Sequence, residues 1–315
     1  KLVEKTDEVY EDENLRIYPI MQKALWEEGY DEEQKYVGSK WGRYIRAPDI
    51  FFKVLKKGKD LFIPLKEVAK VKRGITTGAN EFFYLTQNDI QRWGIERKFV
   101  KNWVIKSPTE SDTIIVDSKK LKYKVLMVHK DKKDLKGTNV LRYIEWGEEQ
   151  GFHKRPTCKS RQRWYDLGER EYGRMLWFKN AWTRLPVLYN SPNTYADCRF
   201  YEISVGRGVS KSISSILNST ISILFAELMG RYTLGLGARD IMTYEASNIL
   251  ILNPSKLNRR TLRKLEKVFD KLNKREIKEI FEEINTTDRQ ELDNLIFDTL
   301  NLTKSERQEV YKAVI

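Results

Sequence analysis

The 315-residue sequence has only two cysteines, two histidines and no long apolar run. The two cysteines, Cys158 and Cys198, exclude a disulfide-stabilised scaffold and a four-cysteine metal site, and free thiols in a reducing cytoplasm are expected. His129 and His153 leave little for a zinc centre, and neither lies in a recognisable nucleophile context. We therefore expect no metal site in this chain.

The sequence also lacks a segment suited to crossing a membrane. Its most apolar stretch, 212–230, is interrupted by serines and by Asn218, Thr220 and Glu227, and it falls short of the ~18 uninterrupted apolar residues of a membrane span. The first residues, KLVEKTDEVY, do not resemble a signal peptide. These absences predict a soluble, cytoplasmic protein with no membrane partner. The chain does not begin with Met, which is compatible with a piece of a longer protein.

Complete catalytic motifs are absent as well. GRGVSKS (206–212) lacks the Gly-Lys-Ser/Thr ending of a phosphate-binding loop, and GLGARD (235–240) lacks the third glycine of a dinucleotide-binding turn. A nuclease-like acid and lysine should lie two residues apart on one strand, whereas Glu67 and Lys70 are three apart and would point to opposite faces. We therefore expect neither catalytic residues nor a cofactor in this chain.

Positive charge is abundant, and it is unevenly distributed. The net charge is +13. Residues 37–255 hold 39 Lys/Arg against 22 Asp/Glu, whereas residues 1–36 hold 5 against 11 and residues 256–315 hold 14 against 12. A surplus confined to the middle points to an acidic partner, with nucleic acid first and an anionic membrane surface second. This interpretation requires the cations to gather on one face of the folded chain.

Apolar spacing and turn residues predict an α+β fold in three parts. Residues 1–60 are helical in parts and form a lead-in, and residues 61–255 form a mixed, strand-rich recognition domain. Within that domain we expect a helix at 138–151, a long buried helix from Ser210 to about Tyr232, and strands at LFIPL, EVAKVKRG, EFFYL, NWVIK, DTIIVD, YKVLMVH, 185–190, 197–205 and 248–253.

Residues 256–315 are predicted to form a helical hairpin or bundle. Leu262, Leu265, Val268, Phe269 and Leu272 make one apolar helix face. Two further helix starts have the spacing of a capping box, in the pairs Asp288/Glu291 and Thr303/Glu306.

Two polar segments are candidates for binding. The loop KRGITTGAN (72–80) offers the charges of Lys72 and Arg73, the hydrogen-bonding groups of Thr76, Thr77 and Asn80, and two glycines, Gly74 and Gly78, that allow close approach of the backbone. Such a loop suits contacts to phosphates or base edges, although turn chemistry alone requires the same residue types. Both interpretations stay open.

The second segment is RPTCKSRQRWYDLGER (155–170). Its cations, Arg155, Lys159, Arg161 and Arg163, suit phosphates, while Trp164 or Tyr165 would stack on a sugar or an exposed base. In the alternative, both rings are buried and the arginines are solvated; we expect one buried ring and several binding arginines. Further charge follows at Arg174, Lys179 and Arg184, interleaved with Trp177 and Trp182.

The order of four motifs resembles a known family. VAKVKRGITTGANEFFYL, RPTCKSRQRWYDLG, ILNSTISILFAELMGRYTLGLGARDI and NILILNP follow one another as in the C-terminal half of adenine-N6 DNA methyltransferases. The chain is most similar to the TaqI-like specificity domain of restriction–modification methylases, with kinship to type I specificity subunits. The resemblance covers about residues 40–255, and the helical tail also recurs in such proteins.

The resemblance implies a division of labour. In that family an N-terminal domain binds S-adenosylmethionine and methylates a flipped adenine, with an Asn/Asp-Pro-Pro-aromatic motif around the base. Neither that motif nor a Gly-rich cofactor turn is present; the nearest text, NSPNTY (190–195), has Ser for the first Pro and Asn for the aromatic. The chain would then be the recognition half, with duplex DNA and a methyltransferase catalytic domain as partners and S-adenosylmethionine bound by that other domain.

Three alternatives stay open at this point. Aromatic residues near arginines serve an RNA-binding module equally well. A protein-interaction subunit would use the acidic N-terminus and the helical tail to dock a methyltransferase or nuclease core. An unrecognised enzyme is the third. If six cations of the middle neutralise DNA phosphates, the logarithm of affinity should fall with the logarithm of salt concentration at a slope of about −5.

Overall fold

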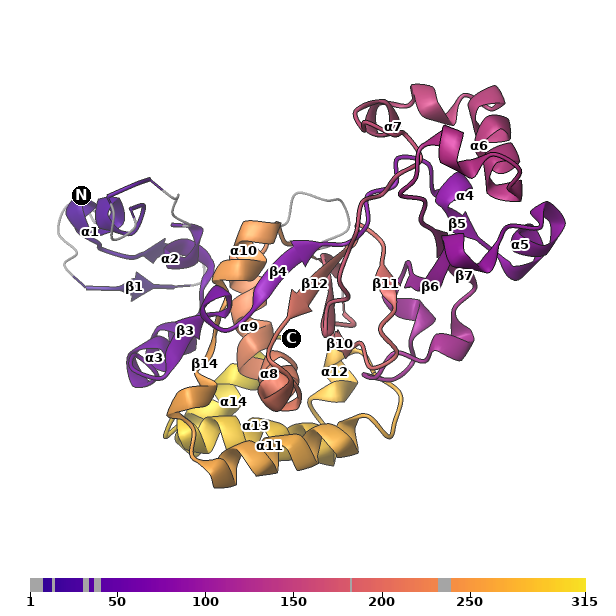
Figure 1. Cartoon of the computed structure of the whole chain (residues 1–315). Helices are drawn as coiled ribbons and strands as arrows, with labels where there is room; N and C mark the ends of the chain where they lie inside the picture. Colours follow the sequence, from indigo (N-terminus) through magenta and orange to yellow (C-terminus); the bar gives the residue numbers. More distant parts are fainter. Residues whose placement is uncertain (1–7, 13–14, 31–33, 37–40, 182, 232–238) are drawn as a thin grey trace.

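The computed structural model describes residues 8–12, 15–30, 34–36, 41–181, 183–231 and 239–315. Among the described residues, helices and strands are interspersed up to β14 and helices alone follow, which confirms the α+β class (Figure 1). Two four-stranded sheets organise the fold, with strand orders β10-β8-β12-β4 and β11-β6-β7-β5. Most of the apolar core divides into two large clusters, one beside each sheet.

The first sheet is antiparallel throughout. Its strands are β4 (Lys70–Arg73), β8 (Met175–Phe178), β10 (Val187–Tyr189) and β12 (Phe200–Ser204). Tyr201 of β12 is paired with Arg73 on one side and Trp177 on the other. β4 lies at the edge of this sheet and is hydrogen-bonded to β12 up to Arg73. The loop that follows it therefore begins at a fixed place.

Helices and a two-stranded pair complete the core of the first sheet. The predicted strand runs at 61–65 and 248–253 form β3 (Phe62–Pro64) and β14 (Leu250–Leu252), which pair antiparallel. The packed helices are α3 (Asp49–Lys57), α8 (Ser210–Leu217), α9 (Thr220–Met229), α11 (Arg259–Leu272), α13 (Thr287–Thr299) and α14 (Lys304–Lys312). The remaining short strands are β1 (Tyr10–Glu11), β2 (Arg16–Ile17), β9 (Asn180–Ala181) and β13 (Arg239–Asp240).

The predicted single helix from Ser210 is broken, which corrects the sequence prediction. α8 and α9 are separate helices bent by 64°. At the break, the side-chain amide nitrogen of Asn218 donates to the carbonyls of Val187 and Ser214. Its side-chain oxygen accepts from the backbone amide of Val187. Ser219 then caps α9 by accepting from the Ser222 amide. The predicted end of the helix, Tyr232, lies outside the described residues.

The second sheet carries an aromatic core. Its strands are β5 (Tyr84–Leu85), β6 (Val100–Ile105), β7 (Tyr123–Leu126) and β11 (Tyr195–Ala196), flanked by α4 (Asn80–Phe83), α5 (Gln87–Trp93), α6 (Asn139–Glu149) and α7 (Pro156–Lys159). The helix predicted at 138–151 is thus confirmed as α6. The Phe82 ring packs on Tyr143 and Trp164, with centroids 4.8 and 4.6 Å away.

One predicted strand is present only in part, and another is absent. EFFYL is helical up to Phe83 and extended only in β5, because Phe82 and Phe83 are both buried and their amides bond the Ala79 carbonyl. A half-buried strand would instead bury alternate residues. DTIIVD forms no strand; it contributes one isolated bridge, between Ile115 and Tyr189.

The tail is helical, as predicted. α11 buries Leu265, Val268, Phe269 and Leu272. The Thr303/Glu306 capping box is present at the start of α14. The box predicted at Asp288 is absent, because α13 begins after Thr286 and Asp288 accepts from Arg275 instead.

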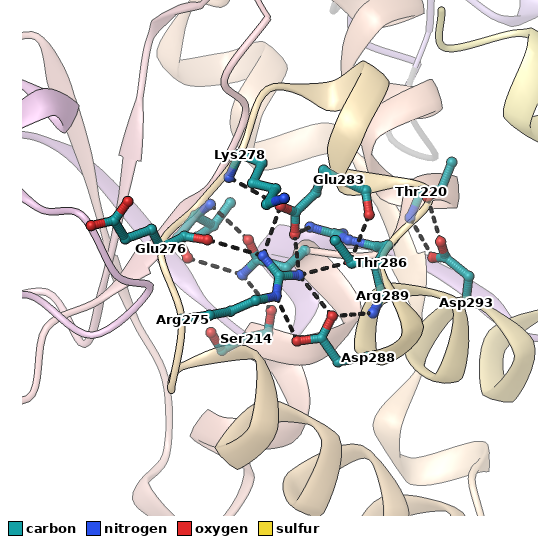
Figure 2. Close-up of polar contacts among 12 residues, drawn as sticks. Ser214, Thr220, Arg275, Glu276, Lys278, Glu283, Thr286, Asp288, Arg289 and Asp293 are labelled. Atoms are coloured by element: carbon teal, nitrogen blue, oxygen red, sulfur yellow. Dashed lines mark hydrogen bonds and ion pairs between the residues drawn. The ribbon is translucent and has the colours of Figure 1, made fainter.

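A buried ion cluster ties the tail together (Figure 2). Arg275 donates to Glu283 (2.8 Å) and to Asp288 (2.7 Å), and Arg289 donates to Glu283 (3.1 Å). The cluster joins the segment after α11 to α12 (Ile280–Glu283) and to the start of α13. Further along α13, Asp293 accepts from the amide (2.8 Å) and the hydroxyl (2.6 Å) of Thr220 at the start of α9.

The lead-in is only partly attached to the core. α1 (Gln22–Glu27) and α2 (Gly42–Arg46) bury no residue fully, whereas α3 buries Ile50, Phe51 and Val54. Among the described residues, eight of the twelve exposed large apolar side chains lie between residues 9 and 45. An uncovered apolar surface of this kind is typical of contact with another protein part. The three-part domain division stays a prediction.

Candidate nucleic-acid interface

The loop after β4 is fixed by close backbone contact. A Cβ atom on Gly74 would lie 2.3 Å from the Asp197 carbonyl oxygen and 2.5 Å from that of Ala196. Next to it, the Ile75 amide donates to the Ala196 carbonyl (2.7 Å). The close approach predicted for Gly74 is therefore made to the chain's own backbone. At this contact the loop passes from β4 of the first sheet to the residues that follow β11 of the second.

Asp197 is the polar anchor of this junction. It is 2% exposed and accepts hydrogen bonds from Tyr84 (3.2 Å), Arg199 (3.1 Å) and Asn80 (3.4 Å). Thr77 is also buried; its hydroxyl donates to the side-chain oxygen of Asn80 and accepts from the Ala79 amide. Thr77 is thus committed within the protein, and its predicted exposure for base-edge contact is wrong.

The structure brings the two candidate segments together. The Arg161 guanidinium donates to the carbonyls of Thr76 (2.6 Å), Thr77 (2.8 Å) and Trp164 (3.2 Å). Arg155 forms an ion pair with Glu81 (2.6 Å) at the end of the same loop. Arg161 therefore holds the loop in place. The sequence predicted that it binds phosphate, whereas in the structure its guanidinium positions the loop.

Both rings of the second segment lie in the core. Trp164 is 9% exposed and donates to Glu148 (2.9 Å), and Tyr165 is 3% exposed and donates to the Lys130 carbonyl (3.0 Å). Burial raises the pKa of the Tyr165 hydroxyl above its ordinary value. The prediction that one of the two rings is free to stack on a base is therefore wrong.

Other predicted phosphate ligands are held inside the protein. Arg163 pairs with Asp166 (2.6 Å) and Asp131 (3.1 Å), and Lys179 with Asp240 (3.6 Å). Arg184 donates to the carbonyls of Pro108 and Ser111, both at 2.7 Å. None of these partners belongs to the loop 72–80. Trp182 lies outside the described residues.

Lys72 faces carboxylates. It is paired across the strands with Glu202, and the two line a groove of about 550 Å³ with Lys70, Arg170, Glu169 and Glu171. Burial, the largest influence, raises the pKa of Glu202, and the charge and hydrogen bond of Arg170 offset this only in part. Three cations and three acids make this groove a poor attractor of phosphate.

Apart from Lys72, four of the predicted contact residues in the joined segments are exposed: Arg73, Thr76, Asn80 and Lys159. We call these the loop surface. Arg73 uses only its Nε atom, which donates to the Cys198 carbonyl (3.0 Å), and Thr76 and Lys159 are exposed. Lys159 and the half-buried Arg174 have no ion pair with any described residue. The loop surface therefore combines free cations with short polar groups.

The described residues offer no site for a metal. No group of three or more His, Cys, Asp or Glu side chains among them is placed to hold an ion. Among the same residues, no single helix is long and apolar enough to cross a membrane; the bent pair α8 and α9 meets the length and composition criteria together, and both helices lie in the core.

Sequence reasoning missed one charged element. Residues 256–275 hold nine Lys/Arg against two Asp/Glu, a local surplus larger than that of 151–180, which hold eight against three. The surplus went unnoticed because the whole tail, 256–315, is nearly balanced. A sum over a shorter window would have found it. Most of these cations belong to α11.

Comparison with known families decides the class of the protein. Residues 39–287 match the family described as the C-terminal domain of the type II methyltransferase M.Eco57I. The chain belongs to this family. The match covers both sheets, the loop surface and α11 to α12.

Individual relatives agree with this family. The type II methyltransferase M.AccI of Acinetobacter calcoaceticus is 26% identical over 165 residues, which make up 51% of this chain and 29% of that protein. Two solved structures are similar in fold. The type IIG restriction endonuclease BpuSI has a TM-score of 0.57 at 12% identity and covers 86% of this chain and 32% of its own. The type IIL restriction–modification enzyme MmeI, in complex with DNA, has a TM-score of 0.51 at 13% identity and covers 80% and 36%.

The chain thus spans about a third of the length of these relatives. It corresponds to a methyltransferase C-terminal domain of restriction–modification systems. The resemblance to restriction–modification methylases inferred from the four motifs is confirmed at that level.

Proposed function

We propose that this family member is the sequence-specific DNA recognition part of an S-adenosylmethionine-dependent adenine-N6 DNA methyltransferase that works in the cytoplasm. Its recognition mode would be TaqI-like, and its catalytic domain, which binds the cofactor, would lie elsewhere in the parent chain or in a partner subunit. The observation that carries the proposal is the family match over residues 39–287. The relative MmeI was solved in complex with DNA, which supports duplex DNA as the partner.

The loop surface supports this proposal chemically. Arg73 and Lys159 offer charges for phosphate oxygens, and Thr76 offers a hydroxyl for a base edge; Asn80, already bonded to Thr77 and Asp197, can add only its second amide hydrogen. Arg73, Thr76 and Asn80 belong to the segment held by Asp197 and the Gly74 contact, and Lys159 ends α7, which Arg161 ties to that segment. A loop held at several points loses little conformational entropy on binding, so its contacts can be selective.

Salt dependence tests the loop surface. The double variant Arg73→Gln/Lys159→Gln should reduce the magnitude of the salt slope of DNA affinity by about 2, since each phosphate contact contributes about 0.9. The measurement is fluorescence anisotropy with a labelled duplex over a range of salt concentrations. Lys133→Gln/Lys136→Gln, which removes the same charge from two exposed lysines elsewhere, should leave the slope unchanged. A flat titration of the wild-type chain, or equal effects of both variants, would contradict the proposal.

Two further measurements separate the alternatives. Duplex DNA should compete better than structured RNA of equal length, because the loop surface lacks an exposed aromatic platform for unpaired bases. Incubation of this chain with labelled S-adenosylmethionine and DNA should give no methyl transfer. Preferential RNA binding would favour the RNA-binding module, and methyl transfer would assign catalysis to this chain.

A further inference from the structure

The α11 helix carries the densest positive surface of the chain. Seven exposed cations lie on the helix or just after it: Arg259, Arg260, Arg263, Lys264, Lys267, Lys271 and Lys274. We call this set the α11 stripe. At 1.5 Å per residue, the 14 residues of the helix extend about 21 Å.

The cations share one side of the helix. Leu265, Val268 and Phe269 face the core, and α11 packs there on α8 and α13. With 3.6 residues per turn, positions such as 260, 263 and 267 fall on the opposite side. The two acids of the helix are engaged elsewhere: Glu266 accepts from Ser212, and the exposed Asp270, which lies on the cation side, pairs with Lys211 of α8 (2.8 Å).

Most of the stripe is electrostatically free. Only Lys271 has an ion pair, with Glu291 (2.5 Å); the other six have none with the residues that the structure describes. Arg163, by contrast, is occupied by Asp131 and Asp166. A free cation that meets a phosphate releases a counterion, whereas a paired cation must first give up its carboxylate. The stripe is therefore better suited to a polyanion than Arg163 is.

A groove runs beside the stripe. It has a volume of about 550 Å³, with Lys264, Lys267 and Lys271 on the α11 side and Gln290 and Asn294 on the α13 side. Its two acids are already engaged, Glu291 by Lys271 and Asp298 by Arg307. The groove thus adds amide groups that can donate to phosphate oxygens.

We propose that the α11 stripe binds the phosphate backbone of duplex DNA as a second contact that reads no bases; this rests on the proposed function. In Figure 1 α11 lies along the lower edge and α7 at the upper end, so the stripe and the loop surface are well separated. The stripe consists of Lys and Arg spread along one face of a helix that packs side-on against the domain, an arrangement that suits contacts to successive phosphates. It therefore holds DNA that flanks the target, and it strengthens binding to every sequence equally.

The triple variant Arg260→Gln/Arg263→Gln/Lys267→Gln tests the stripe. Gln has nearly the helix propensity of Arg and Lys, so α11 should stay folded, as circular dichroism and urea unfolding can verify. The salt slope should lose about 3 in magnitude, since each contact contributes about 0.9. Affinity at fixed salt should fall by the same factor for target and non-target duplexes, so the specificity ratio stays unchanged.

A variant of equal charge is the control. Lys119→Gln/Lys122→Gln/Lys136→Gln removes three exposed cations elsewhere and should leave the slope unchanged. An unchanged slope in the α11 variant would overturn the inference, and so would an equal loss in both variants. If Arg73→Gln/Lys159→Gln still lowers the slope, the proposed function survives; if the wild-type chain binds no duplex, both fail. Polyglutamate of the same total charge as the duplex is a competitor for the stripe. If it displaces the DNA, the stripe binds an acidic protein instead, and the inference is overturned.

Discussion

Replacement of Arg275 by methionine should lower the free energy of unfolding by about 3 kcal/mol, because it removes the central cation of a largely buried cluster. The Arg275 side chain is 25% exposed, and it faces Glu283 (5%) and Asp288 (16%). Without it, Arg289 is the one charged partner that the buried Glu283 keeps among the described residues. Loss of one partner from a buried pair costs about 3–5 kcal/mol, and the partial exposure of Arg275 places the expectation at the low end.

The same cluster makes the tail sensitive to acid. Burial, the largest influence, would raise the pKa of Glu283 and of Asp288, but hydrogen bonds from Arg275 and the nearby positive charges lower both below their ordinary values. A carboxylate with a lowered pKa stabilises the fold above its unfolded-state pKa of about 4, and this stabilisation is lost as the pH falls through the lower folded-state value. The difference between the wild type and Arg275→Met should therefore be largest near neutral pH and shrink below about pH 4.

Urea unfolding at several pH values measures both effects. Lys271→Met is the matched control, because it removes a cation that lies four residues before Arg275 and also pairs with α13. Its pair with Glu291 is exposed (54% and 43%), so the expected loss is at most about 1 kcal/mol. If the two variants lose equal stability, or if the Arg275→Met difference grows in acid, the cluster does not anchor the tail.

Local periodicity predicted the tail better than any other part. The apolar face of α11 and the capping box at Thr303 depend on residues within one or two turns, and the structure contains both. The break between α8 and α9 depends instead on Asn218, which bonds Val187, 31 positions away. A sequence window cannot detect such a contact, so the predicted helix ran on too far.

The candidate site shows the same division. The sequence identified two segments, 72–80 and 155–170, that the structure brings together through Arg161. Composition cannot distinguish a free arginine from a paired one, since Asp131, which occupies Arg163, lies 32 positions away. Adjacent rings such as Trp164 and Tyr165 also look alike in sequence whether they are buried or exposed. Free cations in this fold are identified by tertiary contacts: a short charge window reveals the surplus in α11, but only the structure shows which of its cations have no ion pair with a described residue.

Replacement of Gly74 by alanine should destabilise the chain by about 2 kcal/mol and weaken DNA binding. The new methyl carbon would lie 2.3 Å from the Asp197 carbonyl oxygen, and backbone cannot yield as a flexible side chain can. Overpacking costs about 1–3 kcal/mol or more, whereas the lower chain entropy of the unfolded alanine variant returns only about 0.4–1 kcal/mol. The net effect is therefore destabilising.

The displacement should spread along the loop surface, since the Gly74 amide donates to the Phe200 carbonyl (2.9 Å) and the Ile75 amide to that of Ala196 (2.7 Å). Hydrogen exchange should report faster exchange of both amides, and anisotropy should report weaker binding to the target duplex. Gly206→Ala is the control, because a Cβ atom there meets no atom within 4 Å. Full stability of Gly74→Ala would mean that the loop does not need this contact. A destabilised variant that still binds its target with full affinity would remove the loop surface from DNA recognition.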